Sequence, residues 1–160
     1  MLLVPVVAAT AAAASSGARH GTIPTVSCFD AIEHPNTGHG SGYRVVLGVV
    51  SVPPVYLEQA VPTHTEPWRY WRKAGLLVRM GSPVVTVSVP AAWRNRVAVT
   101  WGSAGTVSAL RIGHCPPPAT AWSAYAGGFY VRSPACVPLL FRIGPRTATV
   151  WFGVGRRCAR

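Results

Sequence analysis

The sequence predicts an all-β protein, a sandwich of two sheets with about eight strands and two disulfide bonds. Hydrophobic residues make up 49% of the 160-residue chain and charged residues only 12%, which favours a packed core over disorder. The chain contains 16 glycines and 15 prolines without a regular period, and such frequent interruptions are typical of short strands and turns. The four cysteines are an even number, which fits two disulfide bonds in an exported protein.

Eight segments have the β-branched and apolar composition of strands, and each is bounded by Gly, Pro or Ser. They are residues 43–52, 75–80, 83–89, 95–101, 106–112, 122–131, 137–143 and 147–154. In the third segment Val85, Val87 and Val89 share one face, and the fourth alternates in the same way. The only candidate for a helical turn lies near residues 91–94. This pattern predicts a Greek-key sandwich, immunoglobulin-like or jelly-roll, and leaves the strand order open.

The N-terminal residues predict export. Residues 2–14 (LLVPVVAATAAAA) form an apolar run that is too short for a membrane-spanning helix. Small-residue cleavage sites follow it, as in a secretory signal peptide. We therefore expect a signal peptide, a flexible N-terminal segment, and a sandwich domain to which Cys28 is tied back, at residues 1–18, 19–42 and 43–160. No later window is apolar enough to span a membrane, so we expect a secreted or cell-wall-associated protein.

The sequence leaves three disulfide pairings open. We favour Cys28–Cys158, which would tie the two ends of the domain together. The second bond would then be Cys115–Cys136, which would close the proline-rich segment after Cys115. The cysteines form no C-x-x-C motif and no cluster with histidine at zinc-finger spacing, so we expect no structural zinc.

Charge is distributed unevenly along the chain. The net charge is +11, and no acidic residue follows Glu66, whereas all the cations except Arg19 and Arg44 lie beyond it. Such a basic region attracts anionic polymers or surfaces. Alternatively, the many arginines reflect only the codon composition of a GC-rich genome. Because export separates the protein from nucleic acid, we expect no nucleic-acid partner.

The best candidate for a binding site is residues 67–73 (PWRYWRK). The predicted binding residues are Trp68, Tyr70, Trp71, Arg72 and Lys73. In an extended chain Tyr70 and Arg72 would share one face, and Trp71 and Lys73 the other. One face would pack on the core, and the other would present a ring flanked by cations to an anionic wall polymer, a glycan or a protein partner. The alternative is an edge strand whose cations prevent pairing with another sheet.

The sequence contains few residues suited to enzyme catalysis. With only four acidic residues, the chain offers little for a pair of catalytic carboxylates, and it has no G-x-S-x-G motif. We therefore expect no cofactor and no resident metal. One alternative is a small secreted metal-dependent enzyme that uses His34, His39 and His64. Another is a secreted effector that binds a partner protein.

One spaced pattern of cysteines, aromatic residues and glycines runs through the C-terminal part: Cys115…Trp122-x-x-Tyr125-x-Gly127-Gly128-Phe129…Cys136-x-Pro138…Gly153-x-Gly155-x-x-Cys158. This pattern resembles small exported β-rich proteins of high-GC Gram-positive bacteria. The resemblance covers most of the mature chain. It implies an exported protein and brings no known activity with it.

Overall fold

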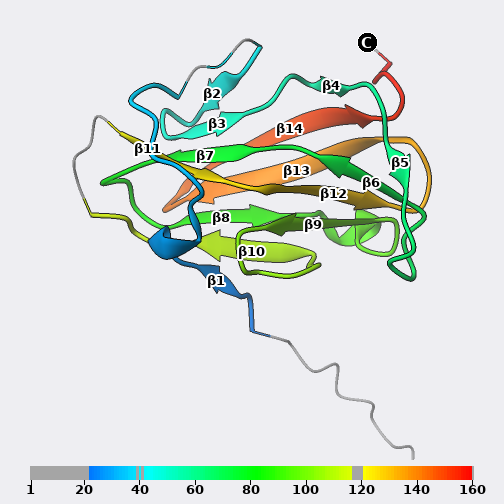
Figure 1. The fold of residues 1–160 in the computed structure, drawn as a ribbon, viewed down its shortest axis with the longest axis horizontal. Helices are drawn as coiled ribbons and strands as arrows, with labels where there is room; N and C mark the ends of the chain where they lie inside the picture. Colours follow the sequence, from blue (N-terminus) through cyan, green and yellow to red (C-terminus); the bar gives the residue numbers. More distant parts are fainter. Residues whose placement is uncertain (1–21, 39, 41, 117–120, 160) are drawn as a thin grey trace, which may run out of the picture.

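The computed structural model describes residues 22–38, 40, 42–116 and 121–159. The predicted signal peptide, residues 1–18, lies outside them. The all-β class is confirmed, because the described elements are strands and two short 3₁₀ turns, η1 (Cys28–Asp30) and η2 (Ala91–Trp93). The second of these turns lies where the sequence allowed a helical turn. The strands form three hydrogen-bonded sheets, where the sequence predicted two (Figure 1).

The largest sheet, which we call sheet A, has six strands. In spatial order they are β1 (Thr25–Val26), β10 (Ala109–Ile112), β8 (Val85–Ser88), β13 (Ala135–Ile143), β14 (Arg146–Val154) and β4 (Tyr56–Leu57). Its first strand comes from within the predicted N-terminal segment. There β1 pairs in parallel with β10, and Val26 is fully buried.

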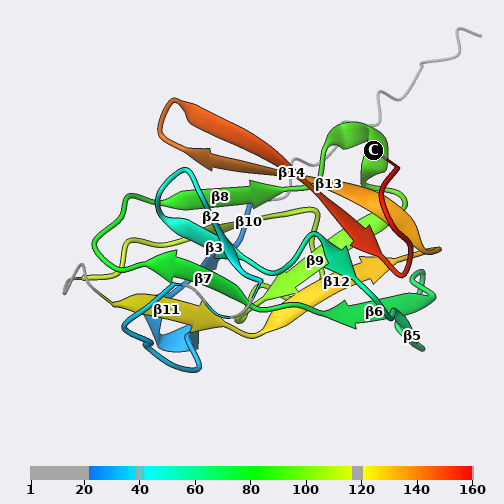
Figure 2. The ribbon, with the colours of Figure 1, turned by 90° about the horizontal axis from the view of Figure 1, so that it is seen from above.

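The other two sheets have four strands each. Sheet B contains β11 (Trp122–Tyr125), β7 (Leu76–Arg79), β3 (Val50–Val52) and β2 (Arg44–Val46). Sheet C contains β5 (Val61–Pro62), β6 (Tyr70–Lys73), β12 (Gly127–Val131) and β9 (Val97–Trp101). In Figure 2, β8, β13 and β14 lie on one side of the molecule, and β6, β7, β11 and β12 lie on the other.

Local breaks turn single predicted strands into pairs of strands. The predicted strand 43–52 is a hairpin of β2 and β3, because Leu47 and Gly48 adopt positive φ values of 52° and 77°. The predicted strand 122–131 is interrupted at Ala126, between β11 and β12. Pairing nevertheless continues across this break, since the backbone N–H of Ala74 donates a hydrogen bond to the carbonyl of Gly127 over 2.8 Å.

Strands β12 and β9 approach each other closely at this break because residue 127 is a glycine. A Cβ atom added to Gly127 would lie 1.8 Å from the carbonyl oxygen of Thr100 on β9. Any residue with a side chain would therefore force β12 and β9 apart, so glycine is required here.

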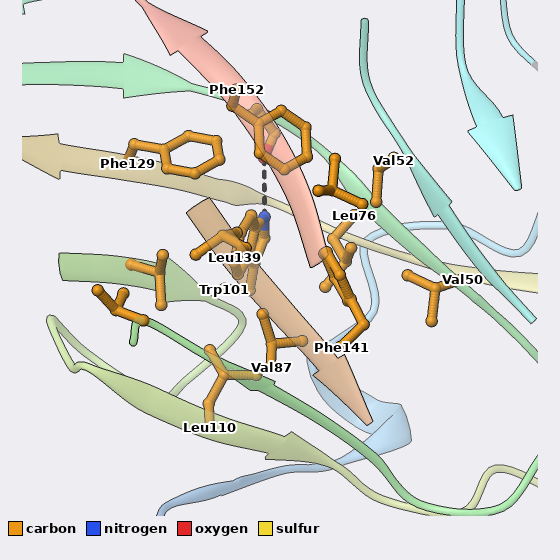
Figure 3. Packing of buried hydrophobic residues seen from close by; sticks show 14 of the residues in the cluster. Val50, Val52, Leu76, Val87, Trp101, Leu110, Phe129, Leu139, Phe141 and Phe152 are labelled. Carbon is orange, nitrogen blue, oxygen red and sulfur yellow. Dashed lines mark hydrogen bonds between the residues drawn. The ribbon is translucent and has the colours of Figure 1, made fainter. Parts of the chain in front are cut away.

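The core contains apolar side chains from all three sheets. The alternation predicted for Val85, Val87 and Val89 is confirmed, since all three are fully buried. The largest fully buried side chains are Trp101, Tyr125, Phe129, Phe141 and Phe152. Figure 3 shows several of them packed together, and the Phe129 ring lies 5.7 Å from Trp101 and 5.2 Å from Phe152 between centroids. Each large apolar side chain buried in this way contributes about 1.5–3 kcal/mol.

Trp101 also forms the one polar contact drawn in Figure 3. Its indole Nε1–H donates a hydrogen bond to the carbonyl oxygen of Ala74 over 2.8 Å. Ala74 lies between β6 and β7, where the chain passes from sheet C to sheet B. The bond therefore satisfies a buried carbonyl at the junction of the two sheets.

All four cysteines form disulfide bonds, as predicted, but the favoured pairing is wrong. The bonds are Cys28–Cys115 and Cys136–Cys158, with Cα atoms 5.5 and 5.0 Å apart. Cys28 follows β1 and Cys115 follows β10, and parallel pairing brings the ends of these two strands together. Cys136 on β13 lies opposite Gly153 on β14, so the C-terminal tail needs only to turn back to reach it.

Candidate functional site

Strand β6 carries the second half of the PWRYWRK motif and lies between β5 and β12 in sheet C. Opposite it on β12, Phe129 faces Arg72 and Tyr130 faces Trp71. Phe129 is fully buried in the core, so Arg72 begins on the core side of the sheet. Because strand side chains alternate, Trp71, Lys73 and Tyr130 point to the opposite side, away from the core.

Trp71 and Tyr130 form the aromatic centre of this outer side. In the same cross-strand row, Val61 of β5 lies opposite Trp71, and Ala98 of β9 lies opposite Tyr130. Ala98 is only 3% exposed, so larger neighbours cover it. Both aromatic residues are half-buried. They therefore pack on the sheet and still present ring surface to solvent.

Cations flank the two rings. Lys73 is exposed and lies two residues beyond Trp71 on β6. On the opposite side of this row, Arg69 lies two residues before Trp71 and Arg132 two residues after Tyr130. The backbone N–H of Arg69 donates to the carbonyl of Val131, and that of Arg132 donates to the carbonyl of Arg96. Arg69 and Arg132, which border the neighbouring strands β6 and β12 at this end of sheet C, are both exposed. Like charges on neighbouring strands repel one another, and a bound anion would relieve that repulsion.

We call this surface the aromatic–cationic face of sheet C and define it by Arg69, Trp71, Lys73, Tyr130 and Arg132. It lies on the side of the sheet that points away from the core. Two apolar rings can pack against the flat side of a ligand, and three cations can donate charge-assisted hydrogen bonds to its anionic groups.

The other predicted binding residues have structural contacts. Tyr70 packs against the core cluster. Arg72 is half-buried, and its Nη1 donates a hydrogen bond to the carbonyl of Gln59 over 2.9 Å, which holds the loop before β5 against β6. Trp68 is half-buried, and its backbone N–H closes a turn to the carbonyl of Thr65. Of the predicted set, Trp71 and Lys73 lie on the open face.

The alternative interpretation of PWRYWRK as an edge strand does not match its position. The edge of sheet C on this side is β5, which pairs with β6 through Val61 and Pro62. Because proline has no N–H, it suits an edge strand, which must not pair with a further chain.

The structure describes two of the three histidines of the metal-dependent alternative, and they lie beside different sheets. His34 Nδ1 lies 3.3 Å from the hydroxyl of Ser123, and His64 is exposed in the loop that precedes β6. His39 lies outside the described residues. Among the described residues, no group of three or more His, Cys, Asp or Glu side chains could hold a metal ion.

Sequence reasoning missed Tyr130 and Arg132. A signal for their orientation was present, because Phe129 and Val131 alternate with them and belong to the core. What the sequence lacked was the register that places Tyr130 opposite Trp71, since these residues lie far apart in the chain.

Comparison with known protein families, curated proteins and solved structures found no match to this chain. Within the described part of the chain, no helix has the length and hydropathy needed to cross a membrane. The geometry of the aromatic–cationic face is therefore the basis for the function proposed below.

Proposed function

We propose that the protein is a secreted, non-catalytic module of the cell envelope that binds an anionic wall polymer or glycan on the aromatic–cationic face of sheet C. The observation that carries this proposal is the placement of two solvent-facing rings, Trp71 and Tyr130, between the cations Lys73, Arg69 and Arg132. No catalytic group is needed for this role.

The physical contributions match a polymer better than a small ligand. Each sugar ring that packs on an aromatic ring removes apolar surface from water, at roughly 25 cal/mol per Å². Each exposed ion pair adds roughly 0–1 kcal/mol and weakens as salt is added. Such contacts are individually weak, and a chain of repeating units compensates because several of them bind at once.

Two further features support the proposal. Two disulfide bonds fit an extracellular location, as does the resemblance of the cysteine pattern to exported proteins.

We also propose that sheets B and C act as one layer opposite sheet A, which would restore the predicted two-sheet sandwich. The pairing of β6 with β12 and of β7 with β11 in one continuous register supports this grouping.

Retention of the purified protein on immobilised dextran sulfate, with neutral dextran as reference, tests the proposal. We expect retention on the anionic polymer alone, and elution as salt shortens the screening length from about 10 Å at 0.1 M to about 3 Å at 1 M. The Trp71→Ala variant, which keeps the net charge, should elute at clearly lower salt.

A pair of charge-matched variants separates a site from general attraction. The double variant Arg69→Gln/Arg132→Gln removes two cations of the face, whereas Arg142→Gln/Arg146→Gln removes two exposed cations of the β13–β14 hairpin. We expect the first to lose far more retention than the second. Equal losses, with Trp71→Ala behaving as wild type, would rule out this face as the binding site.

A further inference from the structure

A second pair of aromatic residues, both tryptophans, meets on the outer side of sheet A. Trp151 of β14 is 49% exposed, and its chain neighbours Val150 and Phe152 are buried, so Trp151 points away from the core. Trp93 of η2 lies beside it, with ring centroids 6.3 Å apart and ring planes at 82°. The two indoles therefore form a corner with two nearly perpendicular walls.

A cleft of about 390 Å³ opens beside this corner, and we call it the tryptophan cleft. Its lining includes Trp93, Trp151 and three arginines, Arg96, Arg156 and Arg157, and none of the described residues that line it is acidic. The volume lies within the range of small-ligand sites. Because no carboxylate of the described lining neutralises the arginines, the cleft is complementary to an anionic ligand.

The C-terminal tail is held so that its arginines line the cleft. Gly155 has a φ of 69° and turns the chain after β14. The carbonyl oxygen of Arg156 then packs over Gly153. A Cβ atom added to Gly153 would lie only 2.3 Å from this oxygen. The bond Cys136–Cys158 fixes the end of the tail to β13. The turn at Gly155, the close contact with Gly153 and the disulfide bond therefore fix the backbone that carries Arg156 and Arg157.

Two of these arginines are also ordered by stacking. The guanidinium carbon of Arg96 lies 4.2 Å from the centroid of the Trp93 ring, and its Nη2 donates to the carbonyl of Ala92 over 3.3 Å. The guanidinium carbon of Arg157 lies 4.2 Å from the centroid of the Tyr56 ring. Stacking of this kind limits the freedom of a long side chain, so less entropy is lost when a ligand binds.

We propose that the tryptophan cleft is a second binding site, which takes a single sugar unit that carries one carboxylate or phosphate group. Perpendicular indoles contact two non-parallel sides of a puckered sugar ring, whereas a flat nucleobase would stack on only one of the two rings. The arginines supply the hydrogen-bond donors for the anionic group. This site lies outside the aromatic–cationic face of sheet C and does not depend on it.

Titration of the ¹⁵N-labelled full-length protein, followed through the indole N–H signals of Trp93 and Trp151, tests the proposal. The variants Trp93→Phe and Trp151→Phe assign the two signals. Glucuronic acid and glucose 6-phosphate are the probes, and we expect at least one of them to move both signals with a Kd of about 1 mM or tighter. Glucose and inorganic phosphate, which each supply one half of the ligand, should bind at least tenfold more weakly. The stronger probe identifies the anionic group.

Charge-matched variants complete the experiment. Arg156→Gln/Arg157→Gln should weaken binding of the stronger probe at least tenfold, while Arg142→Gln/Arg146→Gln should leave it unchanged. The remaining amide signals show that each variant is folded. The proposal is overturned if neither sugar moves the two indole signals, if inorganic phosphate or adenosine monophosphate binds as tightly as the sugars, or if both variant pairs weaken binding equally. The indole signal of Trp71 reports separately on sheet C.

Discussion

Trp71 and Tyr130 are direct cross-strand neighbours on β6 and β12, on the side of sheet C that points away from the core. The adjacent cross-strand pair, Arg72 and Phe129, points to the other side, where Phe129 is fully buried. Residues next to each other in the chain therefore differ sharply in what they contribute. One row is available for binding, and the next stabilises the fold.

This difference predicts that truncating the two neighbouring rings will lower the stability by very different amounts. Phe129→Ala should lower the free energy of unfolding by about 3–5 kcal/mol, because it leaves a cavity in the packed core. Tyr130→Ala, one residue away, should lower it by less than about 1 kcal/mol, because its ring covers only the outer side of the sheet. Urea unfolding followed by circular dichroism measures both. Similar losses for the two variants would contradict the assignment of the faces.

The hydrogen bond from Trp101 to Ala74 predicts a specific cost for Trp101→Phe. The variant keeps a ring in the core but removes the indole donor, so the buried carbonyl of Ala74 loses its partner. We expect a loss of about 1–3 kcal/mol for the unsatisfied carbonyl, in addition to the loss from the smaller ring. Trp151→Phe is the matched control, and since Trp151 is half-exposed it should change the unfolding free energy little. A Trp101→Phe variant as stable as that control would show that the bond contributes nothing.

The disulfide pairing predicts which double serine variants contain free thiols. Cys28→Ser/Cys115→Ser removes one bond and should leave no free thiol, whereas Cys28→Ser/Cys158→Ser breaks both bonds and should leave two. A thiol-reactive dye counts them on the denatured, unreduced protein. If the second variant proves free of thiols and the first contains two, the pairing Cys28–Cys158 is correct after all.

The two bonds should also differ in their contribution to stability. They close loops with sequence separations of 87 and 22 residues. In the chain-entropy model the longer loop contributes about 4.6 kcal/mol and the shorter about 3.4 kcal/mol. Removing Cys28–Cys115 should therefore lower the urea midpoint more than removing Cys136–Cys158 does. The opposite order would mean that native contacts of the C-terminal tail outweigh the entropy of loop closure.

Asp30 predicts a loss of stability in acid. The backbone N–H of Ser27 donates a 2.7 Å hydrogen bond to Asp30 Oδ2 and is the main reason that the pKa of this carboxyl is lowered; burial opposes the shift, and the hydroxyls of Ser103 and Ser27 add to it. Because the folded-state pKa is lower than the unfolded one, the ionised carboxylate stabilises the fold above the unfolded-state pKa of roughly 4. That contribution is lost as the pH falls through the folded-state pKa.

Urea unfolding between pH 6 and pH 2 tests this linkage. The Asp30→Asn variant should lose less stability than the wild type as the pH falls, since it has no carboxylate to protonate. The Ser103→Ala variant lacks one hydrogen-bond donor to Asp30 Oδ2, so its loss of stability in acid should lie between those of the wild type and Asp30→Asn. An Asp30→Asn variant with the same pH dependence as the wild type would show that Asp30 makes no contribution.

Strand periodicity made much of the fold predictable. Alternation identified the buried face of β8, and Gly, Pro and Ser marked the ends of the longer strands, because both signals depend on residues that are close together in the chain. The shortest strands β1, β4 and β5 were missed. Two paired residues give too short a pattern to recognise, and each of these strands is defined by its pairing with a longer strand.

The candidate site was predictable only in part. The sequence showed that Trp71 and Lys73 would share one face of an extended segment, because that follows from the geometry of a strand. It could not show that Tyr130 and Arg132 would join them, nor that Arg72 would bond to the loop at Gln59. Contacts between distant segments depend on register, and a local pattern carries no information about register.

The sequence by itself determined the all-β class, the faces of the longer strands, the bonding of all four cysteines and a basic C-terminal part rich in arginine. The tertiary structure alone decided which cysteines pair, that the strands separate into three sheets, and that Trp93 and Trp151 meet at a corner beside three arginines. The reason is physical. Alternation, turns and charge act over a few neighbouring residues, whereas pairing between distant strands is fixed only when the whole core packs at once.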